Sequence, residues 1–199
     1  MVLREHVLKA IFFTPRMSAC RRRLLWGLNA AVPGPPGVAK TSLPYKTAYE
    51  NGFEVYVFTA SSKLPSDRDG VPIVQPYELA ESAYSGFDGE RKIPVTTRGV
   101  PVWAVQTHER PTVVFFDDIT AGNTPQMLAS IVEVIQEHSL ADGFHLGPMT
   151  RMMAAFNPRW CAAGGIKLSA PLANRLLFMP VMLNDTYLNV SIDQAFVKS

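Results

Sequence analysis

The sequence lacks the features of a secreted, membrane-spanning or strongly charged protein. Cysteine occurs only at Cys20 and Cys161 among 199 residues, which provides no disulfide framework and favours a reducing compartment. We therefore expect a cytoplasmic protein. No window approaches the roughly 20 uninterrupted apolar residues of a membrane-spanning helix, so no membrane partner is expected. The formal net charge is only +2, and Arg21–Arg23 is typical of a solvated stretch, so the charge argues against a nucleic-acid partner.

The sequence does contain enough apolar material for a sizeable core. Hydrophobic residues make up 47% of the chain, which argues against disorder, and the length suits one domain or one domain with a small appendage. We find no internal repeat and no low-complexity segment. Apolar stretches rich in β-branched and aromatic residues are predicted strands: Leu24–Val32, Phe53–Ala60, Thr112–Phe116, Met152–Phe156 and Leu177–Val181.

Helical segments alternate with these strands. Pro125–Glu137 has apolar residues at helical spacing, Ala170–Leu176 is a second predicted helix, and another is expected to begin near Lys40. Residues 61–99 are polar and interrupted by prolines, which predicts loops and one short helix over Tyr77–Tyr84. The alternation predicts an α/β fold, a three-layer α/β/α sandwich around a mainly parallel five-stranded sheet.

A loop rich in glycine and proline follows the first predicted strand. It agrees with the Walker A phosphate-binding pattern except at Ala39, where glycine is usual. In such a loop, backbone N–H groups surround the phosphates, a lysine meets their charge and a hydroxyl ligates magnesium. Lys40 and Thr41 supply the last two groups, and the amino end of the next helix adds its dipole. The predicted nucleotide-binding residues are Gly34, Pro35, Pro36, Gly37, Val38, Ala39, Lys40, Thr41 and Ser42.

The alanine in this loop sets a condition on its backbone. Ala39 fits only if it keeps a negative φ angle, because its Cβ disfavours the left-handed region. The alternative interpretation is a Pro/Gly turn that happens to precede Lys40 and Thr41. The strand-like run before the loop and the helix expected after it favour phosphate binding, since the motif requires both.

Two aspartates follow the most apolar of the predicted strands. Val113–Phe116 is typical of a strand buried on both faces, and Asp117 and Asp118 stand at its carboxyl end, where α/β sheets bind ligands. We expect Asp117 to hold magnesium, directly or through water. Asp118 is expected to orient or deprotonate the attacking water. The alternative is a strand end with two solvated carboxylates.

Four motifs occur in the order seen in AAA+ ATPases: Gly34–Thr41, Val113–Asp118, Ala154–Pro158 and Leu172–Phe178. The resemblance covers roughly residues 24–181 and is closest to the MoxR-like and dynein-related branch. It implies a P-loop ATPase that uses ATP and Mg²⁺. It also implies a homo-oligomeric ring or a weak, ATP-favoured assembly, and a protein client that the sequence does not identify.

The same resemblance implies roles for two further residues. Asn157 corresponds to sensor 1, a polar side chain that helps position the attacking water; the alternative is an Asn-Pro turn that caps a strand. Arg175 corresponds to the arginine finger, which reaches the γ-phosphate of a neighbouring subunit; the alternative is a surface arginine. The predicted catalytic residues are Lys40, Asp118, Asn157 and Arg175, and the predicted metal ligands are Thr41 and Asp117.

The sequence departs from the family pattern in two places. The usual Asp-Glu pair is Asp117-Asp118, so the second carboxylate is one methylene shorter and slow hydrolysis is expected. The family's helical lid does not fit into residues 182–199, which are expected to form only a tail. The other expected parts are an N-terminal helix and connector over 1–23, in which Pro15 interrupts the periodicity, and the nucleotide-binding core over 24–181. Residues 139–147 resemble the hairpin before sensor 1, and residues 86–99 the insertion in the second helix.

The resemblance therefore predicts ATP binding and hydrolysis that serve remodelling or chaperone-like activation of a protein partner. Two alternatives from other classes stay open. The missing lid and the shorter Asp118 would suit a nucleotide-binding switch or scaffold with little hydrolysis. A nucleic-acid-dependent motor would need a basic track with aromatic residues, which the near-neutral charge disfavours.

Overall fold

A computed structural model of the chain describes residues 15–25, 27–59, 70–78, 92–121, 125–140, 143–158, 168 and 170–181. The first 14 residues and the predicted tail over 182–199 lie outside this part. The elements in chain order are α2 (Pro15–Leu25), β1 (Ala30–Pro33), α3 (Ser42–Asn51), β2 (Glu54–Thr59), β3 (Pro72–Glu78), β4 (Lys92–Arg98), α5 (Val102–Glu109), β5 (Thr112–Asp117), α6 (Pro125–Glu137), β6 (Thr150–Phe156), α7 (Ala170–Ala173) and β7 (Leu177–Phe178).

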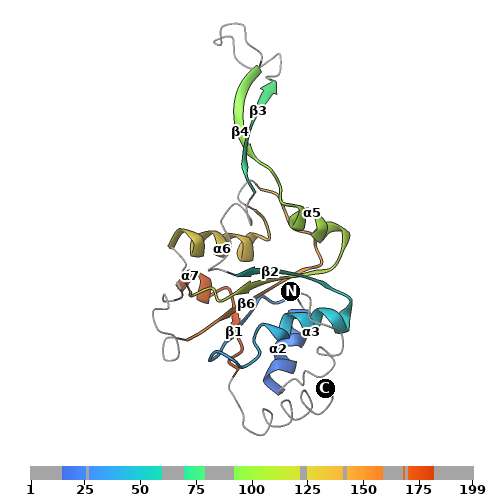
Figure 1. The fold of residues 1–199 in the computed structure, drawn as a ribbon, viewed down its shortest axis with the longest axis vertical. Helices are drawn as coiled ribbons and strands as arrows, with labels where there is room; N and C mark the ends of the chain where they lie inside the picture. Colours follow the sequence, from blue (N-terminus) through green and yellow to red (C-terminus); the bar gives the residue numbers. More distant parts are fainter. Residues whose placement is uncertain are drawn as a thin grey trace, which may run out of the picture.

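The main sheet has the strand order β2-β5-β6-β1-β7, and each neighbouring pair in it is parallel (Figure 1). Parallel neighbours require crossover connections, and helices supply most of them here. Val113, Val114, Phe115 and Phe116 of β5 are at most 1% exposed, as expected for a strand covered on both faces. The predicted α/β fold with a parallel five-stranded sheet is confirmed.

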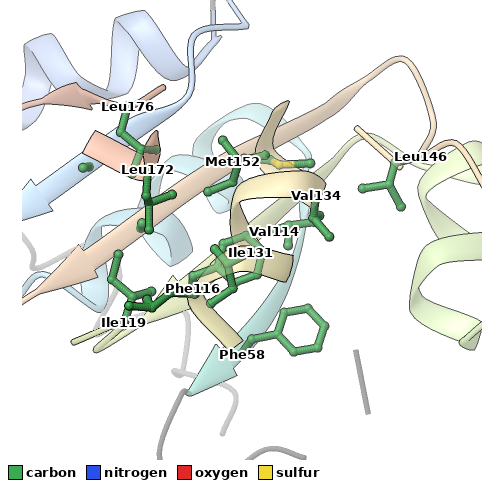
Figure 2. Packing of buried hydrophobic residues seen from close by; sticks show 14 of the residues in the cluster. Phe58, Val114, Phe116, Ile119, Ile131, Val134, Leu146, Met152, Leu172 and Leu176 are labelled. Carbon is green, nitrogen blue, oxygen red and sulfur yellow. The ribbon is translucent and has the colours of Figure 1, made fainter. Parts of the chain in front are cut away.

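Helices cover both faces of the sheet, and the sheet separates the core into two clusters. Successive side chains of a strand point to opposite faces, so Val114 and Phe116 join one cluster and Val113 and Phe115 the other. The first cluster contains α5, α6 and α7, with residues such as Ile131, Val134, Leu172 and Leu176 (Figure 2). The second contains α2 and α3, through Cys20, Leu24 and Leu43. Helix α3, which follows the phosphate loop, therefore lies on the face opposite to α6 and α7.

The predicted first strand, Leu24–Val32, is wrong at its amino end. Helix α2 continues to residue 25, and β1 begins only at Ala30. Cys20 and Leu24 are both buried in the second cluster, and a spacing of four residues places them on one side of a helix. Gly27 has a φ angle of 84° and donates its N–H to the oxygen of Leu24 at 3.0 Å. This left-handed glycine ends the helix, and β1 starts three residues later.

Two prolines occupy first helical turns instead of interrupting helices. Pro15 is the first residue of α2, so a helix begins at the proline expected to interrupt the periodicity, and the residues before it lie outside the described part. Pro44 is buried within the first turn of α3. The N–H groups of a first turn have no acceptor within the helix, so proline removes no hydrogen bond at these positions. The phosphate loop is therefore followed closely by a helix, as the Walker pattern requires.

The segment predicted to hold loops and a short helix over Tyr77–Tyr84 instead contributes a hairpin. Strands β3 and β4 pair antiparallel and project from the body of the fold (Figure 1). Tyr77 lies in β3, while residues 79–84 lie outside the described part. Strand β4 falls within the insertion expected over residues 86–99.

The prolines of this hairpin protect its edges. Pro76 and Pro94 face each other across the two strands. Two facing prolines have no N–H groups to exchange, so Pro76 and Pro94 form a non-hydrogen-bonded pair, and every second pair along the ladder is of the same type. At these pairs the backbone N–H positions point away from the partner strand. Pro72, Pro76 and Pro94 therefore remove donors from the outer edges and discourage the pairing of a further strand.

The remaining predicted boundaries differ in length only. The helix predicted over Ala170–Leu176 is limited to α7, and the last predicted strand, Leu177–Val181, to β7. Within the segment 139–147, where a hairpin is expected, Ser139 and His145 form an antiparallel bridge, and residues 141 and 142 lie outside the described part. Among the described residues, no helix is long and apolar enough to cross a bilayer.

Candidate functional site

The phosphate loop leaves the carboxyl end of β1 and is held closely by the chain beside it. The N–H of Gly34 donates to the oxygen of Phe156 at 3.2 Å, and the N–H of Val181 donates to the oxygen of Pro33 at 2.9 Å. A Cβ on Gly34 would lie 2.4 Å from the backbone oxygen of Val181, so the loop requires glycine at its first position. Val38 is 6% exposed and anchors the loop in the core between the exposed residues 37 and 39.

Two loop residues have left-handed backbones. Gly37 has a φ angle of 83° and Ala39 one of 60°. The condition that Ala39 keep a negative φ angle is therefore not met, because the loop imposes the conformation that glycine usually supplies at this position. An alanine there carries a strain of about 1–2 kcal/mol from its Cβ. The left-handed conformation at position 39 is thus adopted although the residue is alanine.

Lys40 is buried, at 9% exposure, and its ammonium group is held at the centre of the site. Nζ donates to the backbone oxygens of Gly34 and Pro35 at 2.9 and 2.7 Å, and to Oδ1 of Asn157 at 2.9 Å. The first two bonds close the loop around the lysine, and the third joins it to the end of β6. Lys40 and Asn157, 117 residues apart in sequence, are therefore in direct contact.

Thr41 and Asp117, the two predicted metal ligands, also meet. Thr41 Oγ1 donates to Asp117 Oδ2 at 3.1 Å. Burial is the main influence on Asp117 and raises its pKa; the neighbouring charge of Asp118 raises it further, while the Thr41 bond and Lys40 oppose the rise. A carboxylate and a hydroxyl are oxygen donors of the kind that Mg²⁺ prefers, and Mg²⁺ commonly takes only one or two protein carboxylates. The pair fits a magnesium ion that completes its shell with phosphate and water.

Asp118 begins the turn after β5 and faces Asn157. Its φ angle is 54°, a left-handed value that Asp adopts more readily than most residues. The turn is fixed by the N–H of Ile119, which donates to the oxygen of Ala155, and by the N–H of Ala121, which donates to the oxygen of Asp118. The carboxylate Oδ1 of Asp118 accepts a bond from Asn157 Nδ2 at 3.3 Å. This arrangement brings Lys40, Thr41, Asp117, Asp118 and Asn157 together at the carboxyl ends of β1, β5 and β6.

Arg175 lies apart from these residues. Its Nε donates to Gln136 Oε1, and its Nη1 donates to the oxygen of Pro171 at 2.7 Å. The neighbour of Gln136, Ile135, accepts a bond through its oxygen from Asn29, just before β1. The site around Lys40 lies beyond the other end of β1, a separation of about 13 Å along the strand at ~3.3 Å per residue. Because α6 and α7 also cover the face opposite to α3, Arg175 does not join the phosphate loop of its own chain.

One residue near the site was not among those predicted. Tyr45 follows Thr41 by four residues in α3, so both lie on one side of the helix. Burial, and then the negative charge of Asp117, raise the pKa of Tyr45. The spacing after the Walker threonine is the signal that could have identified it.

Comparisons with known proteins identify the fold. No family model and no curated protein matches the sequence. Among solved structures, a candidate ATPase from Cytophaga hutchinsonii has a TM-score of 0.57 and 17% identity, covering 97% of this chain and 54% of the other. A point mutant of RuvB from Thermotoga maritima has a TM-score of 0.55 and 16% identity, covering 98% of this chain and 51% of the other.

These similarities show that the chain shares the α/β fold of the two structures. At 16–17% identity they establish the fold alone. The chain spans about half the length of each of the two structures. Its activity must therefore be argued from its own site.

Proposed function

We propose that this chain is the nucleotide-binding core of an AAA+ ATPase that binds ATP with Mg²⁺ and hydrolyses it. The main support is the convergence of a buried Walker lysine with Asn157, and of Thr41 with Asp117, at the ends of neighbouring parallel strands. A parallel sheet binds ligands at this edge. In the proposal, the loop N–H groups and Lys40 bind the β- and γ-phosphates.

The magnesium ligands in this proposal are Thr41 and Asp117, and the ion supplies charge that stabilises the transferring phosphoryl group. Asp118 and Asn157 act on the attacking water. The carboxylate of Asp118 accepts its proton or orients it, while the Asn157 amide holds both the carboxylate and Lys40 in place. The shorter side chain of Asp118 favours slow turnover.

Arg175 is proposed to act on the nucleotide of a neighbouring copy in a ring or an ATP-favoured assembly. It is too distant from its own phosphate loop, on the other face of the sheet, to complete its own site. A γ-phosphate held by a P-loop is open on its outer side, and an arginine supplied there can accelerate hydrolysis about 10³–10⁵-fold. Ring assembly would thereby couple hydrolysis to contact between copies. Remodelling or activation of a protein partner is the proposed use of that turnover.

A nucleotide-binding switch is the second proposal, and the aspartate at position 118 in place of the usual glutamate is the observation that favours it. Titration calorimetry and phosphate release with MgATP separate the two. We expect wild-type protein to bind and hydrolyse ATP, and Lys40→Ala to lose both. The control is Lys46→Ala, which removes a lysine that pairs with Glu50 in the same helix. It should retain both ATP binding and hydrolysis. Unchanged ATP affinity in Lys40→Ala would disprove the site, and binding without turnover in wild type would favour the switch.

A further inference from the structure

Arg175 is held in a defined orientation by two acceptors on different elements. Gln136 is in the last turn of α6, and Pro171 is in α7, which packs with α6 in the first core cluster. The side-chain oxygen Oε1 of Gln136 accepts from Nε of Arg175, and the backbone oxygen of Pro171 accepts from Nη1. A guanidinium group has five N–H donors, and these two bonds use the one on Nε and one on Nη1. Within the described residues, Nη2 donates to no acceptor.

Both acceptors are neutral, so neither of them compensates the charge of the guanidinium. Arg21 and Arg110, by contrast, form ion pairs with Glu50 and Glu54. Among the described residues, no carboxylate lies within ion-pair distance of Arg175. An arginine that only stabilises a surface gains from a carboxylate partner, whereas one that must bind a phosphate needs its full charge.

We infer that Gln136 is a positioning residue for Arg175, and that it orients the guanidinium so that Nη2 meets a phosphate of a neighbouring copy. This inference rests on the proposed action of Arg175 between copies. A long side chain loses rotational freedom when it binds, and a bond made beforehand to Gln136 removes part of that cost. The bond also fixes which edge of the guanidinium is free. Gln136 contributes orientation without contributing a negative charge.

Because Gln136 is neutral, replacing it with a charged residue of the same length distinguishes a positioning role from a purely structural one. Gln136→Glu keeps the length of the side chain and an oxygen at the same position, so it keeps or strengthens the bond to Arg175. It also adds a negative charge that neutralises the guanidinium. If Gln136 only fastens α6 to the turn after α7, Gln136→Glu should be tolerated. If it positions Arg175 for a phosphate, Gln136→Glu should impair hydrolysis although the protein stays folded.

The test mixes two inactive proteins and measures restored turnover. Arg175→Ala retains a complete phosphate loop, and Lys40→Ala donates an intact Arg175. In the proposed assembly the mixed interface contains one working site, so phosphate release should exceed that of either protein alone. We then replace the donor by Lys40→Ala/Gln136→Glu and by Lys40→Ala/Gln136→Ala. Both should restore about 10–100-fold less turnover, the scale expected when a catalytic group is misplaced.

A matched donor controls for the chemical change itself. Lys40→Ala/Gln106→Glu makes the same substitution on α5, at another exposed glutamine whose Oε1 is an acceptor, here from the Tyr56 hydroxyl at 3.4 Å. It should restore as much turnover as Lys40→Ala. Thermal melts of every donor identify loss of folding, and the Gln136→Glu donor decides the outcome if the alanine variant unfolds.

The outcomes separate the inference from the proposals beneath it. Equal restoration by the Gln136→Glu donor and the Lys40→Ala donor would overturn the role of Gln136 and leave the shared site intact. No restoration by Lys40→Ala at any concentration, with active wild type, would overturn action between copies and the inference with it. Wild-type protein without turnover would overturn the ATPase proposal itself, and the positioning role would fall with it.

Discussion

The carboxamide of Asn157 bridges Lys40 and Asp118. Its Oδ1 accepts from Lys40 Nζ at 2.9 Å, and its Nδ2 donates to Asp118 Oδ1 at 3.3 Å. An amide oxygen only accepts and an amide nitrogen only donates, so these two partners fix the orientation of the group. One side chain at the end of β6 therefore connects the lysine of the phosphate loop with the acid at the end of β5.

Replacement of Asp118 by asparagine should separate binding from hydrolysis. Asn tolerates the left-handed φ angle of 54° about as well as Asp, so Asp118→Asn should fold normally and bind MgATP. Its neutral amide does not accept the proton of the attacking water, and turnover should fall roughly 10²–10⁴-fold. Glu133→Gln, an exposed change on α6, is the control for charge removal. Equal turnover in Asp118→Asn and wild type would reduce Asp118 to a strand terminator.

Ala39→Gly should stabilise the protein. The left-handed φ angle of 60° strains an alanine but not a glycine, while glycine adds freedom to the unfolded chain. The balance predicts a gain of up to about 1 kcal/mol in the free energy of unfolding, measured by urea denaturation. Ala129→Gly, at an exposed position inside α6, should instead lose about 1 kcal/mol. A similar loss at both positions would show that Ala39 is unstrained.

Asp117→Asn should stabilise the ligand-free protein at neutral pH. Burial raises the pKa of Asp117 above its ordinary value of 3.8, so the folded protein binds this proton more tightly than the unfolded chain does. The resulting stabilisation is complete below the unfolded pKa and is lost as pH rises through the folded one. At pH 7 the ionised carboxylate therefore costs stability, which asparagine avoids. Melting temperatures should differ at pH 7 and converge on acidification; a higher melting temperature for wild type at pH 7 would contradict the assignment.

The same carboxylate should make the effect of magnesium dependent on pH. Mg²⁺ binds the ionised form of Asp117 and must therefore displace its proton. Because the pKa of Asp117 is raised, protons compete with Mg²⁺ at a higher pH than they would at an ordinary aspartate. The Mg²⁺-dependent part of ATP affinity should decline as pH falls toward this pKa. Calorimetric titrations with and without Mg²⁺ measure that part directly. Asp117→Asn should show little Mg²⁺ dependence at any pH, and a dependence equal to that of wild type would remove Asp117 from the metal site.

The hairpin of β3 and β4 should be dispensable for ATP binding. The N–H of Gly99 donates to the oxygen of Val71 at 3.0 Å, the bond that closes a β-turn when two residues separate its ends. Replacement of residues 72–98 by Asn-Gly should therefore preserve the core, change the melting temperature by no more than about 2–4 °C, and leave ATP affinity intact. A scrambled hairpin of equal length is the control. Loss of ATP binding in the shortened protein alone would connect the hairpin to the site.

Much of the site could be predicted from local sequence because its chemistry is arranged in short segments. The phosphate loop and the aspartates depend on a few consecutive residues and on the strand that each follows. The carboxyl ends of parallel strands meet at one edge of the sheet, so the sequence places Lys40 and Asp117 together. In the structure, Asn157 contacts Lys40, and Thr41 contacts Asp117. The hairpin was missed because prolines, which usually indicate loops, stand on unpaired edges where no ladder bond is lost.

The sequence by itself determined the five strands of the main sheet, their parallel arrangement and the motifs at the edge of the sheet, because these depend on apolar periodicity and on neighbouring residues. Only the tertiary structure decided which groups meet across the chain. Ala39 has a positive φ angle in a loop that is closed by the bonds from Lys40 to the oxygens of Gly34 and Pro35. Packing of α6 against α7 fixes the position of the turn before β7, which contains Arg175. Gln136 therefore binds Arg175 on the face of the sheet opposite to the phosphate loop. Contacts between residues far apart in sequence follow from packing, which no local pattern records.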